Sequence, residues 1–136
     1  MKVISWNVQG LGGPICKRLK SRFRKKLKTR NSRGPIDILF LQEHHLNKRR
    51  VDSYGSPMPG QWLMYWSAGI GPNEAQAGVC IAIAEKWKEN ILQYIEVILC
   101  RPQYVVLKIN EVHYGFLNLY APNQVAERTL LGTVVV

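Results

Sequence analysis

Four consecutive large apolar residues, Ile38 to Leu41, stand between Asp37 and the polar run that begins at Gln42. A β-strand made of these residues has apolar side chains on both faces, so both faces need cover from other parts of the protein. Strands of this kind lie inside the sheets of layered α/β proteins. We therefore predict an α/β fold in which one mixed β-sheet has helical cover and residues 36–42 form a central strand.

Other strands are indicated by runs of β-branched and aromatic residues that end at turn residues. We expect them at residues 2–8, 61–67, 78–84, 91–99, 104–109 and 114–120. Asn110 and Glu111 are the expected tip of a hairpin between the last two strands. The strand at residues 61–67 is bulky on both faces, which favours core packing over a platform for stacking bases.

One helix and one loop complete the expected pattern. A helix is predicted at residues 15–29, because apolar residues recur there at helical spacing; they are Ile15, Leu19, Phe23 and Leu27. Residues 47–60 are polar, basic and rich in Pro and Gly, so we expect a surface loop there.

The chain is strongly basic, with 19 Lys and Arg against 9 Asp and Glu, a formal net charge of +10. Such an excess favours a polyanionic partner, and DNA is the partner we expect. Ten of the basic residues lie between Lys17 and Arg33, with no acid among them. Contacts to a DNA backbone, a solvated helix face and a nuclear-targeting run all remain open for this segment. As DNA contacts we single out Lys17, Arg18 and Arg22.

The cysteines and the N-terminal sequence indicate the cellular compartment. Three cysteines without Cys-x-x-Cys spacing argue against a disulfide framework or a zinc knuckle, and indicate a reducing intracellular environment. The N-terminus becomes polar too early for a signal peptide, and no apolar run is long enough to cross a bilayer. We expect an intracellular protein, nuclear or cytosolic, with no membrane contact and no small-molecule cofactor.

Asn7 and Glu43 each stand where a predicted strand ends. In open α/β sheets ligands bind beyond the ends of strands, so the two side chains can converge there. A single carboxylate with an amide nearby suits Mg²⁺, which takes few protein ligands and keeps several waters. The alternative is structural, with Asn7 as a turn residue and Glu43 simply solvated. The functional interpretation requires the two groups to meet at one edge of one sheet.

Four segments resemble, in order, motifs of the endonuclease/exonuclease/phosphatase superfamily. They are Ser5–Leu11 (SWNVQGL), Asp37–Glu43 (DILFLQE), Ala77–Ile83 (AGVCIAI) and Phe116–Asn123 (FLNLYAPN). The Trp-Asn-Val opening and the Tyr-Ala-Pro-Asn segment look closest to the endonucleases of non-LTR retrotransposons, which nick DNA to prime reverse transcription. The resemblance implies that residues 1–128 are the N-terminal part of such a domain, about half of a four-layer α/β sandwich, and that 129–136 form an atypical tail.

The resemblance also implies roles for individual residues. Glu43 would bind Mg²⁺ or Mn²⁺, Asn7 would orient the scissile phosphate, and Tyr120 would reach that phosphate through its phenol. Asn123 would line the substrate groove. In this superfamily water attacks the phosphodiester while the metal stabilises the charge that develops. Gln9 stands where some apurinic-site nucleases carry an acid, which argues against that narrower activity.

Two later motifs of the superfamily, Asp-x-Asn and Ser-Asp-His, do not follow Asn123. They supply the aspartate that activates water and the catalytic histidine, and no histidine of this chain stands in their place. We therefore expect a truncated domain that is inactive or nearly so by itself, with an exposed sheet surface that favours self-association. Two alternatives stay open: a non-catalytic basic module that binds nucleic acid, and a phosphatase of the same superfamily.

Overall fold

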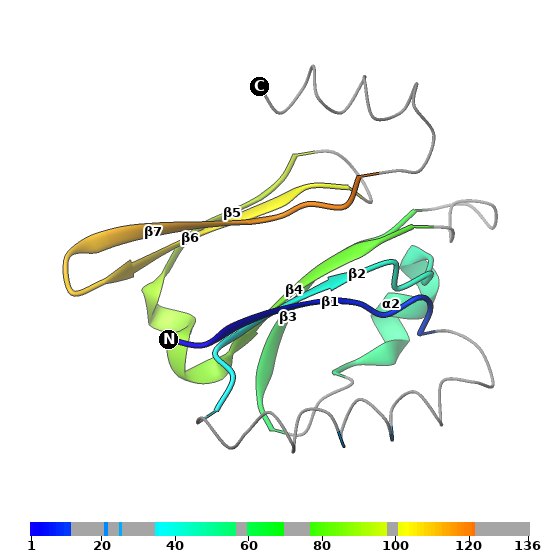
Figure 1. Cartoon of the computed structure of the whole chain (residues 1–136), viewed down its shortest axis with the longest axis horizontal. Helices are drawn as coiled ribbons and strands as arrows, with labels where there is room; N and C mark the ends of the chain where they lie inside the picture. Colours follow the sequence, from blue (N-terminus) through cyan, green and yellow to red (C-terminus); the bar gives the residue numbers. More distant parts are fainter. Residues whose placement is uncertain are drawn as a thin grey trace.

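Two β-sheets lie face to face in the computed structural model (Figure 1). The structure describes residues 1–11, 35–56, 60–69, 77–97 and 101–121, together with Ser21 and Lys25. Sheet A has four strands in the order β1-β2-β4-β3, and sheet B has three in the order β5-β6-β7. The expectation of one mixed sheet is therefore wrong in this respect, because the strands of the second half of the chain form a sheet of their own.

The strand bounds follow the predicted runs closely. Sheet A contains β1 (Val3–Asn7), β2 (Ile38–Gln42), β3 (Trp62–Ser67) and β4 (Val79–Ala84). Sheet B contains β5 (Ile91–Glu96), β6 (Gln103–Ile109) and β7 (Val112–Asn118), and the expected hairpin tip at Asn110 and Glu111 joins the last two. A 3₁₀ helix, η3 (Glu85–Asn90), carries the chain from one sheet to the other.

Sheet A is mixed, and β2 lies inside it as predicted. β2 pairs with β1 in parallel and with β4 antiparallel. Ile38 and Leu39 point to opposite faces and are both fully buried. This is the arrangement expected of a strand that is apolar on both faces.

The apolar core has two layers, one on each face of sheet A. The layer between the sheets is formed by buried aliphatic side chains, namely Ile38, Ile81, Ile83, Val105 and Leu107. The layer on the outer face of sheet A includes Val8, Leu11, Leu39, Leu41, Leu46, Val51, Cys80 and Ala82. β3 contributes to both layers, with Trp62, Met64 and Trp66 on one face and Leu63 and Tyr65 on the other, which confirms its expected role in core packing.

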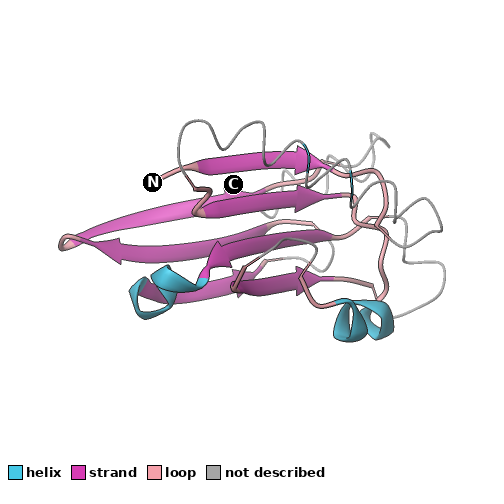
Figure 2. Ribbon diagram, turned by 90° about the horizontal axis from the view of Figure 1, so that it is seen from below, coloured by secondary structure: helices cyan, strands magenta, loops and turns pink. Residues whose placement is uncertain are grey.

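A short helix, α2 (Lys48–Tyr54), forms where a surface loop was expected. The Asn47 side chain accepts a hydrogen bond from the Arg50 N–H at 3.0 Å and caps the helix, and Val51 is its buried residue. The Pro and Gly residues that suggested a loop all follow Tyr54, so they mark the end of the helix instead. α2 and η3 lie at opposite ends of the strands (Figure 2).

Sheet B covers only part of sheet A. The Gln103 side chain of β6 donates a hydrogen bond to the carbonyl of Tyr65 in β3 at 2.8 Å. The Asn118 side chain of β7 donates to the carbonyls of Leu41 in β2 and Cys80 in β4, at 3.2 and 3.0 Å. Sheet B therefore lies over β3, β4 and β2, and β1 projects beyond it.

Several sequence predictions fall outside the described residues. They concern most of the expected helix at 15–29, the tail at 129–136, and four expected substrate contacts, Lys17, Arg18, Arg22 and Asn123. Ser21 and Lys25, which are described, are both helical and exposed. Among the described residues, helices are all too short to reach across a lipid bilayer.

Candidate functional site

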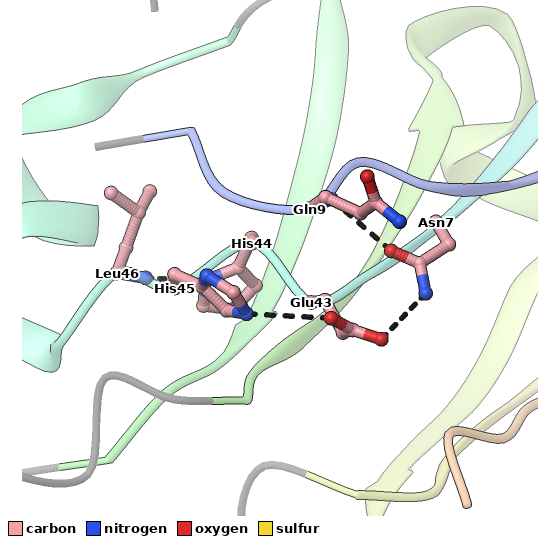
Figure 3. Close-up of polar contacts among 6 residues, drawn as sticks. All are labelled: Asn7, Gln9, Glu43, His44, His45 and Leu46. Atoms are coloured by element: carbon pink, nitrogen blue, oxygen red, sulfur yellow. Dashed lines mark hydrogen bonds and ion pairs between the residues drawn. The ribbon is translucent and has the colours of Figure 1, made fainter. Parts of the chain in front are cut away.

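Asn7 and Glu43 meet at the end of sheet A (Figure 3). The Asn7 side chain donates a hydrogen bond from Nδ2 to Glu43 Oε1 at 2.6 Å. The Asn7 Oδ1 accepts a hydrogen bond from the Gln9 N–H at 3.1 Å, which fixes the orientation of the amide. The predicted meeting of the two groups at one edge of the sheet is confirmed.

The pair forms because two neighbouring parallel strands end side by side. β1 and β2 are in register from Val3 opposite Ile38 to Asn7 opposite Gln42, so Glu43 follows the partner of Asn7 directly. Beyond the strands, the N–H of Val8 donates to the carbonyl of Gln42 at 2.9 Å. Ligands of open α/β sheets bind at this kind of edge, beyond the carboxyl ends of parallel strands.

Glu43 is held in a left-handed backbone conformation, with a φ of 54°. A residue with a side chain adopts this conformation at a cost on the order of 1 kcal/mol or more, so its surroundings must enforce it. The N–H of Gly10 donates to the carbonyl of Glu43 at 2.7 Å, and the N–H of His45 donates to the carbonyl of Ala77 at 2.9 Å. Backbone contacts on two sides thus set the direction of the carboxylate before any ligand binds.

His44 packs beneath this turn and is fully buried. Its Nδ1 accepts a hydrogen bond from the Leu46 N–H at 3.0 Å, so its Nε2 carries the proton and donates to the carbonyl of Ser67 at 3.0 Å. Burial lowers the pKa of His44 to about 4, because the charged ring would lose its hydration. His44 is therefore a neutral structural support for Glu43 at pH 7.

His45 approaches Glu43 from the other side (Figure 3). Its Nε2 lies 3.5 Å from Glu43 Oε2, close enough for an ion pair when the ring is protonated but too far for a good hydrogen bond. This nitrogen is buried and has no hydrogen-bond partner within the described part of the chain. One carboxylate oxygen of Glu43 is thus held by Asn7, and the other faces an imidazole.

The donor chemistry of this pair fits a hard divalent cation. Mg²⁺ is usually bound through one or two carboxylates and keeps several waters, and the Glu43 side chain is 22% exposed. The amide oxygen of Asn7 already accepts from Gln9, so the ligand role falls to Glu43. Across the described segments, no three His, Cys, Asp or Glu side chains gather in a way that could hold a metal ion. An ion at Glu43 would therefore be bound mainly by water and substrate.

β7 ends at the same edge as β1 and β2. Its last residue, Asn118, is buried and accepts a hydrogen bond from Gln42 Nε2 at 2.6 Å. Gln42 Nε2 also donates a hydrogen bond to the Ser5 hydroxyl at 3.0 Å. Tyr120 follows Asn118 by two residues, so their Cα atoms are at most about 7 Å apart. Tyr120 therefore leaves sheet B at the edge where Asn7 and Glu43 lie.

Arg101 also lies in this region, although no sequence motif marks it. Its guanidinium carbon lies 5.3 Å from the ring centroid of Tyr120, which is a cation–π geometry. β6 and β7 are antiparallel with Gln103 opposite Asn118, so Arg101 and Tyr120 extend the same register. The chain has nineteen Lys and Arg residues, and nothing in the sequence distinguishes Arg101 from the others. The strand pairing brings it to the tyrosine.

A pocket of about 340 Å³ lies elsewhere, between α2, β3 and the end of β5. Its lining combines apolar Trp66 with charged Lys48, Asp52 and Glu96. Glu96 also accepts a hydrogen bond from the Ser67 hydroxyl, so its carboxylate is already engaged. Neither Asn7 nor Glu43 lines this pocket, and the strand-end pair is the better candidate for catalysis because it joins a carboxylate to an orienting amide.

No protein-family model matches the chain, and no curated protein matches it by sequence. Solved structures match it by fold. The AP endonuclease LMAP from Leishmania major matches with a TM-score of 0.66 at 18% identity, over 98% of this chain and 44% of that one. The catalytic domain of APE2 from Xenopus laevis matches with a TM-score of 0.58 at 17% identity, over 98% of this chain and 49% of that one.

The chain has the endonuclease/exonuclease/phosphatase fold. This confirms the predicted α/β class and the expectation of about half of the complete sandwich. The chain spans less than half the length of each of the two solved structures.

Proposed function

We propose that this chain forms one side of the catalytic centre of a metal-dependent DNA endonuclease. The observation that carries the proposal is the 2.6 Å hydrogen bond from Asn7 to Glu43 at the ends of two parallel strands. In a fold shared with AP endonucleases, this pair joins an orienting amide to a carboxylate suited to a hard cation. The Trp-Asn-Val and Tyr-Ala-Pro-Asn segments favour the non-LTR retrotransposon type.

Each of these side chains has a distinct task in phosphodiester cleavage. Glu43 would hold Mg²⁺ or Mn²⁺, and Asn7 keeps the carboxylate in place and orients the phosphate. The phenol of Tyr120 donates a hydrogen bond to a phosphate oxygen. A bound divalent ion would stabilise the negative charge that develops on the phosphate as water attacks. The remaining DNA contacts come from Asn123, Lys17, Arg18 and Arg22.

Alone, the chain is catalytically inactive or nearly so. Hydrolysis needs a group that takes a proton from the attacking water. The Asp-x-Asn and Ser-Asp-His motifs that supply such groups in this superfamily do not occur among the 136 residues. His44 is buried with both ring nitrogens engaged, so it does not replace them.

Metal binding is the first test, measured from the electron paramagnetic resonance signal of free Mn²⁺ during titration of the purified chain. Glu43→Gln should abolish the site, and Asn7→Ala should weaken it by about tenfold because the carboxylate loses its orienting partner. Glu89→Gln is the matched control, since Glu89 is an exposed glutamate in η3 far along the chain from the site. Binding by Glu43→Gln equal to that of the wild type would refute the assignment.

Catalysis is tested separately by nicking of supercoiled plasmid in the presence of Mg²⁺. We expect the wild-type chain to nick no faster than Glu43→Ala. Robust cleavage that is lost in Glu43→Ala would support the nuclease chemistry, and it would show that the inactivity proposed for the isolated chain is wrong.

A second candidate function is a non-catalytic module that binds nucleic acid, and the net charge of +10 favours it. This module would bind DNA in a salt-sensitive, metal-independent way, with no effect of Glu43→Gln. The same charge argues against the phosphatase alternative, which turnover of a soluble inositol phosphate would support.

A further inference from the structure

The cavity of about 340 Å³ between α2, β3 and β5 lies at the outer edges of both sheets. β3 is the terminal strand of sheet A, and β5 is the terminal strand of sheet B. The hydroxyl of Ser67, at the end of β3, donates a hydrogen bond to Glu96 at the end of β5 and so joins the two edges. α2 contributes Lys48, Val51 and Asp52 to the lining. We call this cavity the α2–β5 pocket.

The apolar part of the lining contains an indole ring that its neighbours hold in place. Trp66 and Met64 are half-buried, and Val51 is buried. The Trp66 ring makes edge-on contacts with His44 and Tyr54, with ring centroids 5.1 and 5.8 Å away. An indole held in this way beside an open cavity is a surface on which a planar cation can stack.

Two carboxylates and one ammonium group share the pocket with this indole. Lys48 and Asp52 are four residues apart on α2, so they lie on the same side of the helix. Glu96 reaches the pocket from β5. The hydrogen bond from Ser67 takes one oxygen of Glu96, Oε1, and holds the carboxylate in place, so Oε2 remains for a ligand. Within the described residues, Asp52 takes part in no ion pair.

The charge of the lining is opposite to the charge of the chain as a whole. The chain has a formal net charge of +10, whereas carboxylates outnumber the ammonium group at the α2–β5 pocket. A phosphate group placed there would be repelled by both Asp52 and Glu96. The pocket is therefore poorly suited to a nucleic-acid backbone and well suited to a cation.

We propose that the α2–β5 pocket binds a guanidinium group, carried by an arginine side chain of a partner or by a free arginine-like molecule. Guanidinium is planar, donates hydrogen bonds in a fixed fork to carboxylates and stacks on aromatic rings, so Trp66, Asp52 and Glu96 match it together. An ammonium group meets the same carboxylates as a point charge and lacks the planar face that stacks on the indole. Pockets that take small molecules start at about 300 Å³, so the volume is sufficient. Lys48 opposes the cation unless the ligand also carries an anionic group.

The α2–β5 pocket is separate from the pair formed by Asn7 and Glu43. Ser67 of β3 is the strand partner of Val79 in β4. Val79 is in turn the partner of Gln42, which pairs with Asn7. Neighbouring strands are about 4.8 Å apart, so the backbones of Ser67 and Asn7 are about 14 Å apart. A ligand in the pocket would lie at the same end of sheet A as the pair but beside it. The proposal stands on the pocket and does not require the nuclease assignment.

The test is a titration of the isotope-labelled full chain, followed by nuclear magnetic resonance at constant ionic strength. The probe is N-acetylarginine methylamide, which presents an arginine side chain without charged termini. We expect saturable shifts of the Trp66 indole N–H and of the α2 amides, with a dissociation constant in the millimolar range, because both carboxylates belong to exposed residues. The corresponding citrulline compound has nearly the same shape without the charge and should not bind.

Substitutions in the lining test the charge of the ligand. Asp52→Asn and Glu96→Gln each remove one charge at nearly constant size, and each should weaken binding of the probe by about fivefold. Lys48→Met should strengthen binding by about twofold, because it removes a like charge. Glu89→Gln is the matched control, since Glu89 is exposed in η3 and does not line the pocket, and should bind as the wild type. All of these positions are exposed, and circular dichroism checks that each variant is folded.

Free arginine, titrated in parallel, identifies the source of the guanidinium group. Free arginine has an α-carboxylate that Lys48 can bind, and the capped probe has none. Tighter binding of free arginine that Lys48→Met removes would assign the pocket to a free arginine-like molecule. Equal or weaker binding would assign it to an arginine side chain of a partner.

Four outcomes would overturn the proposal. The first is no saturable shift up to tens of millimolar probe, and the second is equal binding of the citrulline compound. The third is unchanged binding in both Asp52→Asn and Glu96→Gln. The fourth is an anion site, which would be seen if inorganic phosphate shifted the same signals and Lys48→Met abolished that shift.

Discussion

One methyl group added at Gly78 should lower the free energy of unfolding strongly. Gly78 has a φ of +97°, and a Cβ there would lie 2.3 Å from Cε1 of the buried His44 ring. We expect Gly78→Ala to lower the free energy of unfolding by about 3 kcal/mol or more, from backbone strain together with displacement of the ring. Gly55→Ala is the control for backbone strain alone, because Gly55 has a φ of +66° with nothing within 4 Å of its Cβ position, and should cost less than Gly78→Ala. Urea denaturation measures both, and equal losses would contradict the packing of His44 against Gly78.

The buried His44 ring also makes stability depend on pH. Its pKa is about 4 in the folded chain against 6.5 when exposed, so between these values only the unfolded chain takes up the proton. The neutral His44 ring therefore makes its full contribution to the free energy of unfolding above pH 6.5. That contribution, up to about 3 kcal/mol, is lost as pH falls towards 4.

Guanidinium denaturation between pH 7 and 4.5 tests this dependence. His44→Gln should have a flatter profile than the wild type in that window. Asp37 affects the pH dependence of stability in a lower pH range. Burial opposes its charge, but hydrogen bonds from Lys86, Trp87 and the Lys2 N–H outweigh burial and lower its pKa, so its contribution is lost only below about pH 3.8. A loss of stability confined to that lower range would contradict the role given to His44.

At the scale of elements, the end of β7 is tied to sheet A by polar groups inside an otherwise apolar interface. Asn118 accepts from Gln42 and donates to the carbonyls of Leu41 and Cys80, and its side chain is buried. Asn118→Leu should lower the free energy of unfolding by about 2–4 kcal/mol, because the buried Gln42 amide loses Asn118 Oδ1 as one of its two hydrogen-bond acceptors. The comparison is Gln93→Leu, at an exposed position of β5, which should change stability by less than about 0.5 kcal/mol. Equal stability of the two variants would mean that the polar link does not hold the sheets together.

For the whole molecule, the excess of positive charge predicts how DNA binding responds to salt. If six basic side chains contact phosphates, affinity should fall about 10³-fold between 50 and 200 mM salt. Replacing Lys17, Arg18 and Arg22 together by alanine should reduce the slope of log affinity against log salt by about three. Fluorescence anisotropy with a DNA duplex measures both quantities.

The control for this prediction is a second basic triplet, Lys48, Arg49 and Arg50, which is exposed at the start of α2. Its replacement by alanine removes the same charge from a different place. Equal slopes for the two triple variants would indicate that binding follows net charge alone, and a salt-independent affinity would contradict a phosphate interface altogether.

Much of the fold could be predicted because strand formation is encoded locally. Runs of β-branched and aromatic residues marked each strand of the described residues to within a few positions, and the doubly apolar run at Ile38–Leu41 predicted a central strand. Helix α2 was missed because its signal, a cap at Asn47 and one buried residue at Val51, is weak beside the Pro and Gly residues that follow. The division into two sheets was missed because it depends on where η3 redirects the chain.

For the candidate site, the meeting of Asn7 and Glu43 at one edge could be predicted as a hypothesis, because each ends or follows a predicted strand; the parallel register of β1 and β2 then brings them together. Three features emerged only from the packing of distant segments: His44 is a buried neutral support, His45 faces the carboxylate, and the Arg101 guanidinium lies over the Tyr120 ring. Those contacts join segments distant along the chain, and their chemistry depends on burial and register that no local pattern contains.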